Sequence, residues 1–106
     1  MIQWFKDLFR GIPLGARRGS GWTEVRSNFL RLNPLCAVCL SKKVEVHHKI
    51  PFYLRRDLEL DPDNLITLCR DHHFWFGHLG DWKAYNIEVS QDAATWQQKI
   101  KGRKYN

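Results

Sequence analysis

Apolar residues recur at intervals of three and four between positions 21 and 32, which is the spacing of one stripe along a helix. The stripe consists of Trp22, Val25, Phe29 and Leu32. Ser20 is placed to cap the start of this helix. Pro34 should end it, because proline disfavours a helical conformation in Asn33 before it.

The middle of the chain changes to a strand pattern. Apolar residues alternate with others over residues 44–48, and residues 65–68 form a compact apolar run. The second run is either a strand or a short buried segment. A helix should begin at Asp71 or His72, so the pattern predicts a small α+β fold.

Two further helices are expected at the ends of the chain. Residues 2–10 place apolar side chains near helical spacing, and a last helix begins at Val89 or Ser90. In this last helix Ala93, Trp96 and Ile100 share a face. We therefore expect a helical, basic N-terminal extension (1–34), a central core (35–78) and a C-terminal helical extension (79–106) in one domain.

Composition narrows the class of protein. The 106 residues carry a formal charge of +6, which favours a polyanionic partner, with nucleic acid as the leading candidate. No apolar run approaches the roughly 20 residues that a membrane span needs, and no signal peptide is visible. The chain is expected to be cytoplasmic, where thiols stay reduced and can bind metal.

All three cysteines fall in two ligand pairs, Cys36-x-x-Cys39 and Cys69-x-x-His72. Two intervening residues let one tight turn direct both side chains at one ion, and two such turns complete a tetrahedron. This is the pattern of a closed Cys₃His zinc site. A core this small benefits from a structural metal. Bound zinc can contribute on the order of 10 kcal/mol to the free energy of folding.

Four histidines remain after the zinc site is assigned. His47 and His48 are adjacent in a predicted strand, so they point to opposite faces or flank a bend, and one can bind a metal while the other acts on water. His73 follows a zinc ligand on a helix and faces a different site. Asn64 precedes the second apolar run and can bond an imidazole.

These elements, in this order, resemble the HNH endonuclease family. The matching segments are 46–51, 64–69 and 70–73. The resemblance covers about residues 35–78 and implies a ββα-metal finger, a DNA substrate and a bacterial or phage source. It implies that His48 is the general base, that His47 and His73 bind the catalytic metal, and that Asn64 holds the loop between the strands or orients His48.

One departure from the family concerns the metal-bearing helix. Some members place a second histidine four residues after the position of His73, where this chain has Gly77. His78 comes one residue later, so it is a further candidate metal ligand whose role the pattern leaves open. A site with few protein ligands suits Mg²⁺ or Mn²⁺ and tolerates Ni²⁺ or Zn²⁺.

Basic residues surround these motifs and are candidates for binding phosphates. They include Arg17, Arg18, Lys49, Arg55, Arg56 and Arg70. Two alternatives to a nuclease stay open: a zinc-finger module that binds nucleic acid without cutting it, and a component of a larger DNA-processing complex such as a phage packaging machine, in which a protein partner would take part.

Overall fold

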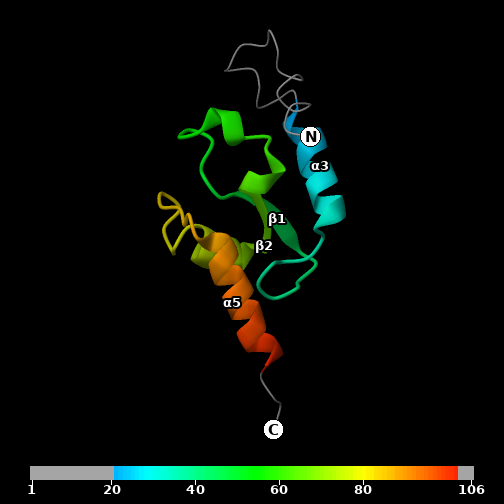
Figure 1. Cartoon of the computed structure of the whole chain (residues 1–106), viewed down its shortest axis with the longest axis vertical. Coiled ribbons are helices and arrows are strands. Elements are labelled where there is room, and N and C mark those ends of the chain that lie inside the picture. The colour runs from blue at the N-terminus through cyan, green and yellow to red at the C-terminus, as the bar shows by residue number, and fades with distance from the viewer. Residues whose placement is uncertain (1–20, 103–106) are drawn as a thin grey trace.

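The computed structural model describes residues 21–102, so the expected 2–10 helix and the Arg17–Arg18 pair lie outside the described residues. Its elements, in chain order, are α3 (Trp22–Leu32), β1 (Val44–His48), η2 (Arg56–Leu58), η3 (Pro62–Asn64), β2 (Leu65–Cys69), α4 (Arg70–His72), η4 (His73–Gly77) and α5 (Val89–Lys101). The fold is small α+β: two antiparallel strands, then a helix, with helices on either side (Figure 1).

The hairpin of β1 and β2 forms the central layer. His47 pairs with Ile66 and His48 with Leu65, so the two adjacent histidines lie on opposite faces of the sheet. Four of the five residues of β2 are buried, which is why this strand is a continuous apolar run rather than an alternating one. The alternative of a strand over 65–68 is therefore confirmed, with Cys69 added at its end.

Two small hydrophobic clusters cover the faces of the hairpin. On one face Leu65 packs with Val25 of α3 and with Leu60 of the loop between the strands. On the other face Ile66 and Leu68 pack with α5 and with the turn over residues 36–39, which we call the knuckle. This cluster also contains Cys36, Val38, Val89 and Ala93. Figure 1 shows α3 and α5 on different sides of the strands. Each strand residue therefore faces one of two distinct environments.

The helix predicted ahead of the cysteines is confirmed, with two corrections. Its N-cap is Gly21 rather than Ser20, and the carbonyl of Gly21 accepts a hydrogen bond from Val25 N at 3.1 Å. Leu32 does not join the buried stripe, because the helix stops at Asn33 and the chain turns away towards the knuckle. The hydroxyl of Thr67 donates to Asn33 O at 2.7 Å and ties this end of the helix to β2.

The last helix begins at Val89, as expected, and buries Val89 and Ala93. Trp96 and Ile100 share that face but are more than one-third exposed, so only its first half is buried in the core. Within residues 21–102 no helix combines the length and the apolar content needed to cross a bilayer.

Candidate metal centres and active site

The side chains of Cys36, Cys39, Cys69 and His72 form one cluster, which we call the zinc cluster. Cys39 Sγ lies 3.8 Å from Cys69 Sγ, and Cys36 Sγ lies 3.7 Å from His72 Nδ1. Ligands about 2.3 Å from a tetrahedral ion lie about 3.7 Å from one another. The cluster is therefore consistent with a closed structural zinc site, as the spacing predicts.

The backbone of the knuckle prepares the zinc cluster. Leu40 N donates to Cys36 O at 2.9 Å, and Leu40 has a positive φ of 64°, which turns the chain sharply after Cys39. Val38 N donates to Cys36 Sγ at 3.4 Å. This bond closes the turn around the sulfur of Cys36 and directs the thiol at the cluster.

The thiols of the zinc cluster influence each other. Burial acts to raise the pKa of Cys36, but hydrogen bonds from Cys39, Cys69 and Val38 and from His72 outweigh it and lower the pKa to about 7. Burial raises the pKa of Cys69 to about 11, and the neighbouring Cys36 adds to this effect. A thiolate disfavours ionisation of the neighbouring thiol by charge repulsion. Full ionisation of the cluster therefore needs a cation among the ligands.

A second group, the three-histidine cluster, consists of His47, His73 and His78. The ring centroids lie 4.9 Å apart in all three pairs. His47 is buried, and its Nε2 has no hydrogen-bond partner among the described residues. A buried nitrogen without a partner is costly unless an ion satisfies it. The structure therefore brings His47 and His73 together, as expected, and adds His78.

A π-helical turn brings His78 into this cluster. In η4 the amide of His78 donates to His73 O, five residues back, at 3.1 Å. The wider turn carries His78 to the same side as His73, and their Nε2 atoms lie 3.2 Å apart. Two nitrogens about 2.0–2.1 Å from one ion would lie about 3.0–3.4 Å apart, so this spacing fits a shared metal.

Hydrogen bonds at the far side of each ring set the tautomers of His73 and His78. His73 Nδ1 lies 2.9 Å from Glu45 Oε1, and His78 Nδ1 lies 2.8 Å from Ala84 O. A carboxylate and a carbonyl accept hydrogen bonds, so each ring carries its proton on Nδ1. Both Nε2 lone pairs then face the same point, which is repulsive unless a cation lies between them.

Electrostatics favour the neutral forms of His47 and His73 and the ionised form of Glu45. Burial, with contributions from His73, His78 and His48, lowers the pKa of His47 to about 3. Burial also lowers the pKa of His73, although the hydrogen bond to Glu45 opposes that shift. The same hydrogen bond lowers the pKa of Glu45. A neutral imidazole is the form that binds metal.

Gly77 gives His47 room within the three-histidine cluster. A Cβ at this position would lie 3.0 Å from two atoms of the His47 ring. Position 77, where the family resemblance suggests a second histidine in some members, is therefore too close to His47 for any side chain without a shift. The π-helical turn supplies the histidine one residue later instead.

His48 lies on the opposite face of β1 but lines the same cavity as the cluster. The cavity has a volume of about 280 Å³, and its walls are Val46, His47, His48, Pro51, Phe52, Tyr53, His73 and His78. His48 Nε2 lies 2.9 Å from Glu59 O, and the ring packs against Trp22 at 4.6 Å between centroids. The carbonyl accepts, so a neutral His48 keeps its proton on Nε2 and its lone pair on Nδ1.

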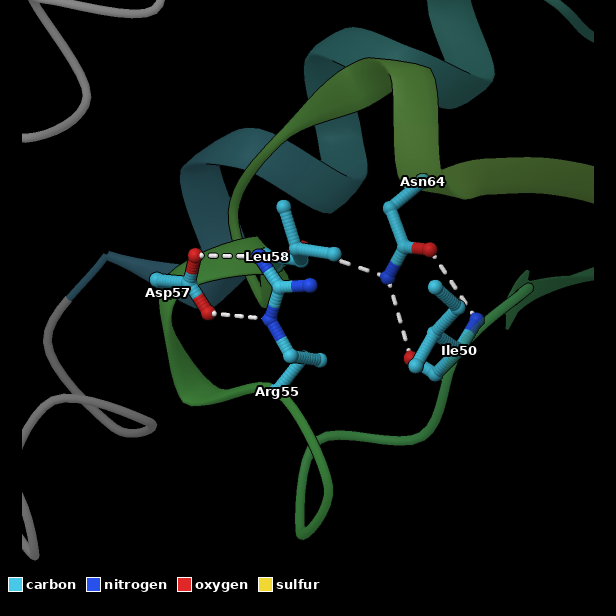
Figure 2. Close-up of polar contacts among 5 residues, drawn as sticks. All are labelled: Ile50, Arg55, Asp57, Leu58 and Asn64. Atoms are coloured by element: carbon cyan, nitrogen blue, oxygen red, sulfur yellow. Dashed lines mark hydrogen bonds and ion pairs between the residues drawn. The ribbon is translucent and has the colours of Figure 1, made fainter.

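Asn64 fastens the loop between the strands. Its Oδ1 accepts from Ile50 N at 3.0 Å, and its Nδ2 donates to Ile50 O at 3.0 Å and to Leu58 O at 3.3 Å (Figure 2). Leu58 directly precedes Glu59, whose carbonyl holds His48. Asn64 is thus placed to fix the backbone on which the orientation of His48 depends.

The basic candidates within residues 21–102 differ in their surroundings. Arg55 is paired with Asp57 at 2.8 Å, as Figure 2 also shows, while Arg56 lies over the ring of Phe52 at the cavity wall. Arg70 is exposed beside the three-histidine cluster, with its guanidinium 4.8 Å from the ring centre of Trp82. Lys49 directly follows His48.

Glu45 is the residue of this site that the sequence reasoning missed. Its signal is present in the pattern, because alternate residues of a strand share a face and Glu45 stands two residues before His47. The contact of His78 with Ala84 O, by contrast, has no counterpart in any spacing.

Comparison with known proteins gives one match. Residues 36–73 match the family model described as HNH endonuclease. Neither the curated proteins nor the solved structures contain a match. The matched segment begins at the first zinc ligand and ends at His73, so His78 lies outside it.

Proposed function

Because residues 36–73 are an HNH endonuclease domain, we propose that this protein is a metal-dependent endonuclease that hydrolyses phosphodiester bonds in DNA. The observation that carries the proposal is the cavity between β1, the loop and η4. It holds a histidine whose tautomer a backbone carbonyl sets, His48, beside three further imidazoles. A candidate base and a candidate metal site therefore share one space of about 280 Å³.

His47, His73 and His78 would hold the catalytic ion. A bound divalent metal supplies positive charge next to the phosphate and the leaving 3′ oxygen as negative charge develops there. All three candidate ligands are imidazoles, which suit Ni²⁺ and Zn²⁺ and bind Mn²⁺ better than Mg²⁺. Mn²⁺ is therefore preferred over Mg²⁺ as the ion that supports cleavage.

His48 is the general base. With its proton held on Nε2 by Glu59 O, the ring offers Nδ1 to a water molecule. The water loses a proton to Nδ1 as its oxygen attacks phosphorus, and the bond to the 3′ oxygen breaks. Asn64 supports this role from the neighbouring backbone, because it holds Leu58 O and thereby the peptide next to Glu59.

Basic residues at the rim would bind the phosphates that flank the scissile bond. Arg70 is exposed beside His73, and Arg56 stands at the wall formed by Phe52. The formal charge of +6 draws DNA towards this surface and makes binding salt-dependent. In the single domain proposed for residues 1–106, both arginines belong to the central core, residues 35–78.

A plasmid assay tests the proposal. Purified protein loaded with one equivalent of zinc is incubated with supercoiled plasmid and Mn²⁺, Mg²⁺ or Ni²⁺, and nicked and linear products are measured. We expect cleavage with Mn²⁺ and none with EDTA. His48→Ala should reduce the rate by about 10²–10⁴-fold, the usual range for loss of a general base. Thr95→Ala, an exposed position on α5, is the control.

Two outcomes would overturn this function. Full activity of folded His48→Ala would exclude His48 as the base. Salt-sensitive DNA binding by the wild type, without cleavage in any of these ions, would instead support a zinc-stapled binding module.

A further inference from the structure

Glu45 contacts the three-histidine cluster from outside the active-site cavity. It projects from β1 on the same face as His47, and its Oε1 lies 2.9 Å from His73 Nδ1. We propose that Glu45 is a positioning residue that holds His73 in the tautomer able to bind metal through Nε2. The inference rests on the proposed metal site, to which His73 would contribute its Nε2 atom.

The tautomer needs such a partner. Neutral histidine in water favours the proton on Nε2, which would block the atom that faces His78. The carboxylate of Glu45 accepts a hydrogen bond and cannot donate one, so it keeps the proton of His73 on Nδ1. Histidines that bind metals commonly donate their second N–H to a carboxylate or a carbonyl in this way, and the contact also fixes the direction of the ring.

Glu45 is itself held in place from the other side. Its second oxygen, Oε2, lies 3.4 Å from Arg70 Nη1, and the guanidinium of Arg70 lies over Trp82. The ring of Trp82 packs at 5.3 Å from His73 and at 4.8 Å from His78. Contacts therefore run from His73 through Glu45, Arg70 and Trp82 back to His73. They restrain the carboxylate of Glu45 where His73 can donate to it.

His78 has an equivalent partner in the backbone, the carbonyl of Ala84. A carbonyl cannot be removed by substitution of a side chain, whereas Glu45 can be changed alone. A substitution of Glu45 therefore tests the orientation and tautomer of His73 without removing a candidate metal ligand.

The test compares Glu45→Ala and Glu45→Gln with Glu24→Gln, an exposed glutamate on α3. The first readout is nitrogen NMR of the His73 ring in protein that carries only the structural zinc. We expect the wild type and Glu24→Gln to hold the proton on Nδ1, and Glu45→Ala to shift it towards Nε2. The second readout is the affinity of a further Co²⁺ ion, titrated alone, which should fall by about 10–100-fold in Glu45→Ala. Glu45→Gln should recover part of this affinity, because the amide oxygen can still accept.

The outcomes separate this inference from the proposed function. An unchanged tautomer and a Co²⁺ affinity within twofold of wild type in Glu45→Ala would overturn the positioning role. Loss of folding in Glu45→Ala leaves Glu45→Gln to decide, and a Gln variant that matches the wild type in folding but loses Co²⁺ binding and the Nδ1 proton supports the inference. If the wild type fails to cut DNA while the NMR and Co²⁺ results hold, the proposed nuclease function fails and the positioning role stands.

Discussion

His73 and His78 are five residues apart, yet their Nε2 atoms lie only 3.2 Å from each other. In an α-helix five residues advance about 500°, which would leave the second side chain about 140° away from the first. The π-helical turn over His73–Gly77 removes this mismatch by hydrogen-bonding His78 N to His73 O. The turn therefore makes a third candidate metal ligand of His78, which regular helical spacing would direct elsewhere.

His78→Ala should weaken the catalytic metal site without loss of the fold. The variant removes one of three converging nitrogens and leaves the zinc cluster intact. We expect cleavage at limiting Mn²⁺ to fall by at least about tenfold, with partial recovery at high Mn²⁺. Metal analysis should still find one zinc per chain. If His78→Ala cleaves DNA as fast as the wild type at limiting Mn²⁺, His78 is not a ligand.

Gly77→Ala should crowd His47. The new Cβ would lie 3.0 Å from the buried imidazole, so the ring or the backbone would have to shift. We expect a loss of about 1–3 kcal/mol in the free energy of unfolding, typical of overpacking, and a weaker metal site. Denaturant unfolding measures the first effect and Co²⁺ titration the second.

Gly102→Ala is the matched control, since a Cβ there meets only two backbone carbonyls, at 3.4 and 3.8 Å, near the exposed end of α5. Its stability should stay within about 0.5 kcal/mol of wild type. Equal behaviour of the two alanine variants would contradict close packing of Gly77 on His47.

Asn64→Ala should loosen the loop that positions His48. The change leaves the amide and the carbonyl of Ile50, and the carbonyl of Leu58, without the bonds drawn in Figure 2. Loss of these hydrogen bonds in the half-buried loop should cost about 1–3 kcal/mol, and the cleavage rate should fall as well. Thermal unfolding and plasmid cleavage measure these effects, with Asn28→Ala on the exposed side of α3 as the control. A folded Asn64→Ala protein with normal cleavage would limit Asn64 to a structural role.

Cys69→Ser should prevent stable folding. Zinc modules of this kind gain on the order of 10 kcal/mol from the metal, and the two hydrophobic clusters of this domain are small. We expect one tightly held zinc in the wild type and little or none in the variant, by metal analysis. Circular dichroism should show the variant unfolded, and EDTA should unfold the wild type in the same way. A Cys69→Ser chain as stable as wild type in EDTA would mean that the zinc cluster does not hold the fold.

Local spacing predicted the parts of this protein that depend on neighbours in the chain. The zinc cluster could be identified because each ligand pair is separated by two residues, and a single turn brings such a pair together. The strands and both flanking helices could be placed because burial on a strand or helix imposes a period on the sequence. The exposure of Leu32 could not be foreseen from the sequence. The apolar spacing of the helix continues to Leu32, but the hydrophobic core does not extend that far.

The sequence by itself determined which residues could bind metal and which four histidines stood apart from the zinc cluster. Only the tertiary structure decided that His78 joins His47 and His73, because that depends on a π-helical turn and on the space beside Gly77. It also decided the partner of His73, since Glu45 lies 28 positions away and meets the ring only when β1 packs against η4. Contacts between distant segments follow from packing, and packing leaves no fixed spacing in the chain.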